Sequence, residues 1–189
     1  MKITIITPCC RPDRLPKVFE SINFDYVDKW IIVYDTSKDR TYTRIYTEHP
    51  KIIEAEFHDN GISGNDQRNF GLKYVTKGFV YFLDDDNIVH PEFWEVLPTL
   101  DENNMYSWDQ ENENGHVNKC YPPTVNAIDT AMFIIPYSLI NDTRWMKQHI
   151  FSDGIFAASI YQKNKSNYIY IPKTLCYYNK LRQAEAKAN

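Results

Sequence analysis

Four short apolar runs in the first half of the chain constrain its fold most strongly. They cover residues 3–7, 30–34, 52–57 and 79–83, and Ile, Val, Phe and Tyr predominate in them. Runs of this length that are rich in β-branched and aromatic residues predict strands. Because most of their positions are apolar, the strands are expected to be buried on both faces, as in a parallel sheet covered by helices.

Segments with helical spacing alternate with these runs. Within residues 14–22, apolar side chains recur at intervals of three and four. Residues 65–75 and 91–100 are also expected to be helical, with Ser63 capping the first of them and Pro91 in the first turn of the second. The alternation of strands and helices predicts an α/β fold with a mostly parallel central sheet flanked by helices.

The second half of the chain is less regular. Residues 101–123 are polar, and we expect a loop-rich stretch with a short strand at 105–108. Further strands are expected at 131–135 and 168–171, where the sequence is again apolar. Residues 153–161 place apolar side chains at helical spacing and predict a helix between these strands.

The chain of 189 residues has the length of one domain. We expect a single domain over residues 1–180 and a terminal tail at 181–189, which is rich in Ala and Lys. The formal net charge of -4 supplies no basic field for nucleic acid. No apolar run is long enough for a membrane segment. The four cysteines contain no CxxC pair, so we expect free thiols and a reducing, cytoplasmic location.

Polar clusters follow three of the predicted strands at the point where each strand ends. They occupy residues 7–11, 35–37 and 84–87. In open parallel sheets, ligands bind beyond the carboxyl ends of the strands. We therefore expect the three clusters to converge on one site.

Asp84, Asp85 and Asp86 follow a predicted strand directly. Three adjacent carboxylates repel one another, and a bound cation relieves that repulsion. Mg²⁺ and Mn²⁺ take oxygen ligands, commonly one or two carboxylates together with phosphates and water. The cluster predicts a site for a metal–diphosphate complex, with Mn²⁺ or Mg²⁺ as cofactor. The alternative interpretation is a solvated acidic turn before Pro91.

A glycine-rich segment at residues 61–69 precedes the second predicted helix. Its glycines allow close approach to the backbone, and a helix start favours an anion. Arg68 in this segment is suited to pairing with a phosphate or a carboxylate. Further along the chain, Asp153 and Asp129 are candidates for a base that deprotonates an acceptor hydroxyl, and each is equally a candidate for a helix cap.

The order of these segments resembles the GT-A glycosyltransferases. ITIITPCCRPDRL is similar to the first strand and nucleotide-binding loop of that fold, WIIVYDTSKD to its second strand, and YFLDDDNIVHPEFW to its DxD motif with the following Pro-containing turn. The combination of TP..R, DQRNFGL and DDDN is closest to the glucuronyltransferase-like branch. DDDxxxxPEFW also resembles the large inverting family 2.

The resemblance implies a metal-dependent GT-A catalytic domain. Such a domain moves a sugar from a UDP-sugar donor to a hydroxyl of a carbohydrate or glycoconjugate acceptor, with inversion. Pro8, Arg11 and Asp35 would line the nucleoside pocket, and Arg68 would approach the donor sugar or diphosphate. The chain is short for this fold, which is compatible with one domain of a larger protein.

The resemblance also implies roles for four aspartates. Asp85 would contact the ribose, and Asp86 would bind the metal with Asp84 supporting it. Asp153 lies where inverting members place their catalytic base, which takes the proton of the acceptor hydroxyl while the metal stabilises the departing diphosphate.

Two departures from the family pattern concern nucleotide binding. Cys9 and Cys10 stand where the glucuronyltransferase-like branch has Thr-Tyr, so an aromatic stack on the base would have to come from elsewhere. The segment TLCYYNKL lacks a histidine that helps to bind diphosphate in many members. Tyr177, Tyr178 and Asn179 are the candidates to replace it.

Three other function classes were weighed against a glycosyltransferase. A nucleotidyltransferase of sugar phosphates is expected to carry a glycine-rich, basic loop after the first strand, whereas TPCCRPDRL contains no glycine. An aspartyl-phosphate phosphatase needs its acidic pair after the first strand, and DDDNIV follows the fourth. A non-catalytic sugar- or partner-binding domain of the same fold would keep the architecture and lose metal binding.

Overall fold

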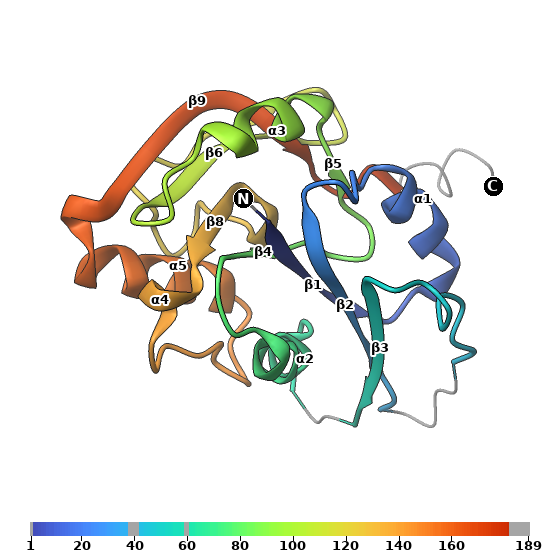
Figure 1. Ribbon diagram of the computed structural model, residues 1–189. Helices are drawn as coiled ribbons and strands as arrows, with labels where there is room; N and C mark the ends of the chain where they lie inside the picture. Colours follow the sequence, from blue (N-terminus) through green and yellow to red (C-terminus); the bar gives the residue numbers. More distant parts are fainter. Residues whose placement is uncertain (1, 38–41, 59–60, 182–189) are drawn as a thin grey trace.

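One mixed sheet organises the computed structural model, which describes residues 2–37, 42–58 and 61–181 (Figure 1). Its strands run in the order β3-β2-β1-β4-β8-β6-β9-β5, and β7 pairs with β6 at the side. The strands are β1 (Ile3–Cys9), β2 (Val27–Asp35), β3 (Ile52–Phe57), β4 (Phe79–Phe82), β5 (Ile88–Val89), β6 (Met105–Glu111), β7 (Val117–Asn118), β8 (Phe133–Pro136) and β9 (Tyr168–Tyr177).

Five α-helices accompany the sheet within the described residues. They are α1 (Leu15–Glu20), α2 (Asn65–Gly71), α3 (Pro91–Val96), α4 (Tyr137–Ile140) and α5 (Ser152–Lys163). Short 3₁₀ turns precede α1, extend α2 and α3, and lead into β8 and β9. None of the described helices has the length and apolar character that crossing a membrane requires.

The strands β1 to β4 form one continuous parallel part of the sheet. Ile5 of β1 lies opposite Trp30 of β2 on one side and opposite Tyr81 of β4 on the other, and β3 continues the parallel set beside β2. From β8 onward antiparallel pairs appear, because β8 runs against both β4 and β6. The predicted α/β class is confirmed. The apolar runs predicted the parallel set β1 to β4, whereas β6 and β9 form a further parallel pair.

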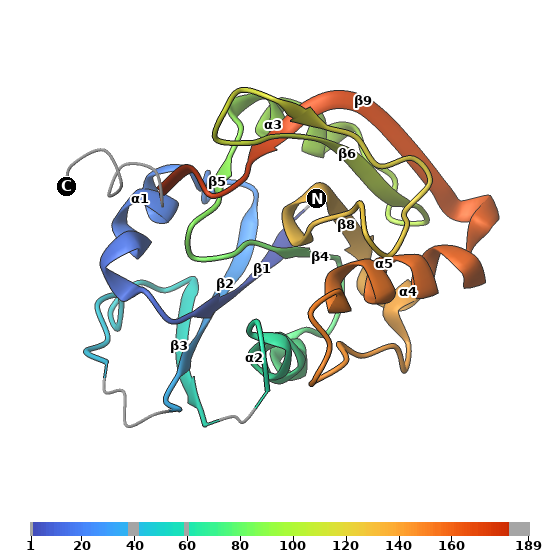
Figure 2. The same ribbon diagram turned by 180° about the vertical axis from the view of Figure 1, so that it is seen from behind.

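Neighbouring residues of β4 show how helices cover both faces of the sheet. The ring of Tyr81 stacks on Phe93 of α3 with centroids 5.0 Å apart, whereas Phe82 meets Phe156 of α5 edge-on at 5.5 Å. Because successive strand residues point to opposite faces, α3 and α5 lie on opposite sides of the sheet, as Figure 2 shows. The core therefore consists of two apolar layers with β4 between them.

The second half of the chain departs most from the sequence prediction. Residues 105–111 form the long, buried strand β6, although only 105–108 of the expected loop were predicted as a strand. Polar residues fit inside it because they have partners: Asp109 accepts a hydrogen bond from the Tyr170 hydroxyl, and Gln110 donates to Asp129 at 2.7 Å. The final strand β9 is also longer than the predicted 168–171.

Two local expectations were wrong or fall outside the described residues. Ser63 does not cap α2, because Gly64 occupies the cap position without a side-chain bond, and Ser63 has a left-handed backbone with φ of 57°. The tail expected at 181–189 lies outside the described residues from 182 onward. Leu181, the last described residue, packs against the core.

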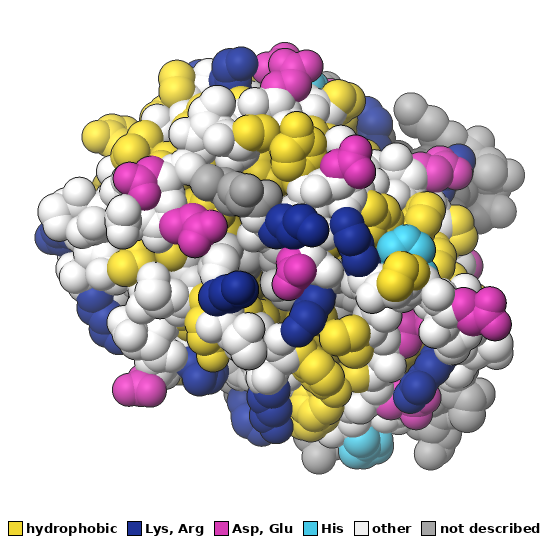
Figure 3. All heavy atoms as spheres, in the orientation of Figure 1, with side chains coloured by type: hydrophobic (Ala, Val, Ile, Leu, Met, Phe, Trp, Pro, Cys, Tyr) yellow, Lys and Arg dark blue, Asp and Glu magenta, His cyan; other side chains and the backbone are white. Residues whose placement is uncertain are grey.

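The molecular surface mixes charges of both signs. On the face in Figure 3, Lys and Arg side chains gather near the middle around an acidic side chain, and further acidic side chains are scattered around them. Apolar side chains separate many of these charges. The mixture agrees with the small net charge of -4 for the whole chain.

Candidate active site at the carboxyl ends of the parallel strands

A cavity of about 360 Å³ opens at the carboxyl ends of β1, β2 and β4. Its walls combine segments from the start, the middle and the end of the chain. The residues to which the family resemblance assigned roles in donor binding, metal binding and catalysis line it, namely Pro8, Arg11, Asp35, Arg68, Asp84, Asp85, Asp86 and Asp153. The convergence predicted for the three polar clusters is therefore present in the structure.

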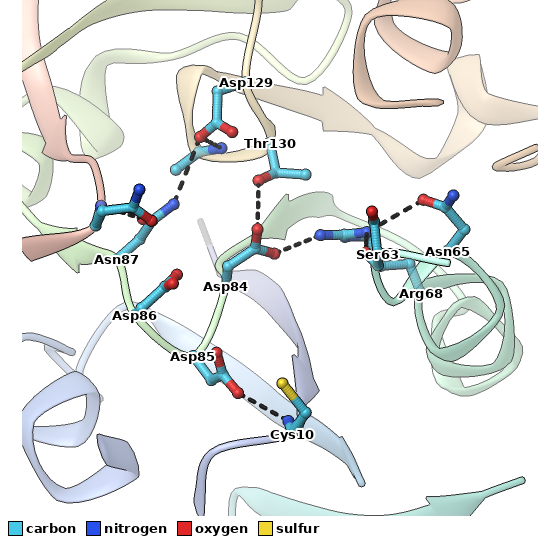
Figure 4. Close-up of polar contacts among 12 residues, drawn as sticks. Cys10, Ser63, Asn65, Arg68, Asp84, Asp85, Asp86, Asn87, Asp129 and Thr130 are labelled. Atoms are coloured by element: carbon cyan, nitrogen blue, oxygen red, sulfur yellow. Dashed lines mark hydrogen bonds and ion pairs between the residues drawn. The ribbon is translucent and has the colours of Figure 1, made fainter. Parts of the chain in front are cut away.

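Asp85 joins the end of β4 to the loop after β1. One carboxylate oxygen accepts the backbone N–H of Cys10 at 2.8 Å (Figure 4) and that of Arg11 at 2.8 Å. The other oxygen accepts the Arg11 guanidinium through Nε at 2.8 Å and through Nη2. The side chain is 1 % exposed. Both oxygens of Asp85 therefore hold the protein's own loop in place.

Asp84 and Asp86 also face arginines. Arg68 Nη2 donates to Asp84 at 2.5 Å, and the Thr130 hydroxyl donates to the other oxygen of Asp84 at 3.1 Å (Figure 4). Asp86 lies 3.0 Å from Arg11 Nη2. The three carboxylates thus lie among guanidinium groups, which relieves the mutual repulsion expected from the sequence.

Arg68 is held in the cavity wall by three kinds of contact. Besides Asp84, its guanidinium donates to the Ser63 carbonyl at 2.7 Å and lies over the Trp145 ring at 4.6 Å. The side chain is 4 % exposed, and its Nε is buried without a hydrogen-bond partner among the described residues. A buried donor without a partner is costly unless a water or a ligand satisfies it.

The glycine before α2 is required by close packing. Gly64 has φ of 72°, and a Cβ at this position would lie 2.6 Å from Cβ of Pro8. Only glycine combines this backbone with such an approach. The segment that carries Arg68 therefore packs directly against the end of β1.

Asp129 lies at the opposite wall of the cavity and caps the 3₁₀ turn before β8. One of its oxygens accepts from Gln110 at 2.7 Å and from Asn87 at 3.4 Å. Burial, and next the charge of Asp84, raise the pKa of Asp129 to about 7. This carboxyl therefore exchanges its proton near neutral pH.

Asp153 lies in the first turn of α5, but it is not the helix cap. Phe151 occupies the cap position, and the Asp153 carboxylate accepts the backbone N–H of Gly154 at 2.8 Å. Burial raises the pKa of Asp153 above its ordinary value. A carboxylate whose pKa is raised by burial is suited to accepting a proton.

The segment after β9 closes the cavity from the C-terminal side. The backbone N–H of Asn179 donates to the Asn87 side chain at 2.9 Å, and that of Leu181 donates to the Asp86 carbonyl at 3.2 Å. Tyr178 and Asn179 line the cavity. Both were candidates to replace the missing histidine, and the structure places them in reach of a ligand there.

The carboxylates of Asp84 and Asp86 fit a divalent cation whose remaining ligands come from a bound diphosphate and water. Within the described residues, no group of three His, Cys, Asp or Glu side chains converges as a complete metal cage. Asp86 and Asp84 both line the cavity, and one or two carboxylates are what Mg²⁺ usually takes from a protein when phosphates complete its shell. Arg11, which contacts Asp86, would have to share that carboxylate with the ion.

Several site residues had no signal in the sequence. Thr130 and Trp145 contact Asp84 and Arg68 from segments far along the chain, and Gln110 belongs to a stretch that was predicted to be loop-rich. Each is an ordinary residue type for a core or a surface. Only the tertiary structure brings them to the site.

Comparisons with known proteins identify the family. The sequence profile described as Glycosyl transferase family 2 matches residues 4–159. A comparison with curated protein sequences finds no match. Similar solved structures include S. aureus TarS 1-349, with a TM-score of 0.72 and 18% identity over 94% of this chain and 60% of that one.

Two nucleotide complexes of the same protein are equally similar. TarS 1-349 with UDP-GlcNAc has a TM-score of 0.73 and 17% identity, and covers 94% of this chain and 58% of that one. The complex with UDP has the same score and identity, and covers 94% and 60%. At this identity the likeness establishes the GT-A fold, and the chain spans about 60% of the length of these structures.

Proposed function

The chain belongs to glycosyl transferase family 2, and from this premise we propose that it is a glycosyltransferase that moves a sugar from a UDP-sugar to an acceptor hydroxyl with inversion. One observation carries the proposal. The cavity at the strand ends contains Arg11 and Arg68 for a diphosphate, and Asp153 for the acceptor proton. The UDP and UDP-GlcNAc complexes of the structurally similar TarS support uridine as the base and make UDP-GlcNAc the first donor to test.

The donor would lie along the wall formed by β1, β2 and α2. Pro8 and Asp35 line this wall and would contact the nucleoside, and Arg68 would contact the diphosphate or the donor sugar. The Nε of Arg68, which is buried without a partner among the described residues, gives this side chain a donor to direct at a phosphate oxygen. Asp85 supports the nucleoside wall by holding the loop after β1, and a contact with the ribose remains a prediction.

We propose Asp86, with Asp84 beside it, as the protein ligands of Mn²⁺ or Mg²⁺. A divalent ion at this place supplies positive charge that stabilises the diphosphate as it leaves. Arg11 and Arg68 supply positive charge to the same region from the protein. Each arginine already contacts one of the two aspartates, so donor binding would loosen these ion pairs.

Asp153 would act as the base. The acceptor oxygen forms a bond to the anomeric carbon while the bond from that carbon to UDP breaks, and the acceptor proton passes to the Asp153 carboxylate. Attack from the side opposite to UDP inverts the configuration of the anomeric carbon. The raised pKa of Asp153 suits it to holding that proton.

Calorimetric titration tests donor and metal binding. UDP and GDP are titrated with Mn²⁺ and with EDTA into the wild type, Asp86→Ala and the control Asp142→Ala, whose side chain is exposed. In Mn²⁺ we expect UDP to bind more tightly than GDP. We expect UDP binding to weaken at least tenfold in EDTA and in Asp86→Ala, and to stay unchanged in the control Asp142→Ala. Absence of nucleotide binding to folded wild type would overturn the proposal.

A further inference from the structure

A second cavity of about 280 Å³ adjoins the first. Four residues line both cavities, namely Asp129, Ile150, Asp153 and Tyr178. The proposed base therefore stands at the boundary between the two spaces. A group that accepts a proton from one substrate during its attack on another must be reachable from both.

Amide side chains supply the polar groups of the second cavity. Gln110 and Asn118 lie opposite each other on β6 and β7, and Asn126 comes from the loop that leads toward β8. Amides donate and accept hydrogen bonds without charge. They are therefore suited to hydroxyl groups, which also do both.

The charged groups of the second cavity are all acidic. Asp129 and Asp153 line it, whereas its described lining residues include no Lys, Arg or His. This contrasts with the first cavity, whose lining includes Arg11 and Arg68. An anionic substrate would face the ionised Asp153, which acts as the base, with no cation on the lining to offset its charge.

Exposed apolar side chains complete the lining of the second cavity. Val125, Ile150 and Phe151 are 39%, 67% and 42% exposed, and they are three of the seven large hydrophobic residues that are exposed in the described part of the chain. Apolar surface that gathers at a cavity marks a binding site more than scattered exposure does. A sugar ring offers C–H groups to such a surface and hydroxyls to nearby amides.

We propose that the second cavity is the acceptor subsite and that it selects an uncharged, multiply hydroxylated acceptor such as a neutral sugar unit. The inference rests on the proposed function, since it needs Asp153 as the base and a donor in the first cavity. It adds the place and the chemical class of the acceptor. Phosphorylated or carboxylated acceptors are disfavoured by the ionised Asp153, and neutral hydroxyls are bound by the amides.

Paired ligands test this selectivity directly. Methyl glucoside, methyl galactoside and methyl N-acetylglucosaminide are compared with their 6-phosphates and with methyl glucuronide, by saturation-transfer NMR on the UDP-bound protein. We expect at least one neutral glycoside to bind, and at least tenfold weaker binding of its anionic counterpart. Equal or tighter binding of the anionic members, or no binding of any neutral member, would overturn the inference.

Two variants test whether this selectivity arises in the second cavity. Phe151→Ala is expected to weaken binding of the neutral glycoside at least fivefold. Ile45→Ala, a control at an exposed apolar residue, is expected to leave this binding unchanged. Asn118→Lys is expected to reverse the preference toward the anionic ligand, whereas Asn114→Lys, in the exposed turn before β7, does not. An unchanged preference in Asn118→Lys would place the acceptor elsewhere.

A separate measurement distinguishes failure of the proposed acceptor subsite from failure of the proposed function. UDP affinity is measured for every variant by calorimetry. If UDP binds normally while the acceptor variants have no effect, only the subsite is wrong. If wild type binds no UDP, the proposed function fails and the inference fails with it.

Discussion

The Asp85 carboxylate accepts the backbone N–H of Arg11 at 2.8 Å and, through its other oxygen, the Nε of the same arginine at the same distance. This double contact ties the end of β4 to the loop after β1, across 74 residues of sequence. The loop and the acidic cluster both line one cavity. Its shape therefore depends on an interaction that also contributes to stability.

Replacing Asp85 by Asn tests this link. The variant loses the ion pair and leaves one loop N–H poorly satisfied, so we expect the free energy of unfolding to fall by about 2 kcal/mol. UDP affinity should fall as well, because the loop after β1 loses its anchor. Chemical denaturation and UDP titration measure both effects.

Asp13→Asn, at an exposed site in the neighbouring turn, is the control and should change stability by less than about 0.5 kcal/mol. Unchanged stability in Asp85→Asn would contradict the structural role.

Replacing Asp153 by Asn separates chemistry from donor binding. We expect sugar transfer to slow by about 100-fold or more, because removal of a general base costs this much. UDP binding should stay within about twofold, since the side chain faces the acceptor side. Steady-state kinetics with Asp142→Asn as the exposed control measure the difference. Near-normal turnover would remove Asp153 from the role of base.

The pH dependence of the wild-type rate gives a second test of Asp153. Burial raises the pKa of this carboxyl, and only its ionised form accepts a proton. The rate should therefore fall as the pH is lowered, at a pH above the ordinary aspartate value of about 4. A rate that stays constant down to pH 4 would argue that another group takes the proton.

Asp129 should make stability depend on pH. Its pKa is raised to about 7 in the folded protein, so the folded state keeps a proton that the unfolded chain releases above pH of about 4. The free energy of unfolding should fall as the pH rises from about 4 to about 7, by at most about 1.4 kcal/mol per pH unit, and level off above 7. Asp129→Asn should remove this slope. An identical slope in the variant would assign the effect to other groups.

Gly154→Ala should disturb the boundary between the two cavities. A Cβ at this position would lie 2.0 Å from the Val125 carbonyl oxygen, so the loop that carries Val125 must move. An added methyl group usually favours a helix, but here we expect a loss of about 1–3 kcal/mol from overpacking. Thermal unfolding against Ser159→Ala, a control on the same helix, measures it. A stabilised variant would show that the loop yields freely.

Local sequence patterns predicted the parallel half of the fold and its ligand edge. β1 and β4 end in polar clusters, and the edge of a parallel sheet brings such ends together whatever the rest of the chain does. Asp84 to Asp86 could be placed there because the apolar strand directly before them fixes their position. Arg68 could be placed because a glycine-rich turn precedes its helix.

Contacts between distant segments could not be predicted in the same way. Thr130 reaches Asp84 over 46 residues of sequence, and Trp145 packs on Arg68 without any motif of its own. The second part of β6 was not predicted, because Asp109 and Gln110 are residue types that are common in loops. Their buried hydrogen-bond partners are evident only in the tertiary structure. Arg11 and Arg68 were expected at the site, but the specific pairs that they form with Asp84, Asp85 and Asp86 could not be predicted from the sequence.

Anomeric proton NMR of the reaction tests the central claim most directly. The wild type is incubated with Mn²⁺, a set of UDP-α-sugars beginning with UDP-GlcNAc, and the neutral glycosides that bind. We predict that the α-anomeric donor signal declines, that UDP appears in equal amount, and that a β-linked product grows. A folded protein that consumes none of these donors, or that yields an α-linked product, would contradict an inverting UDP-sugar transferase.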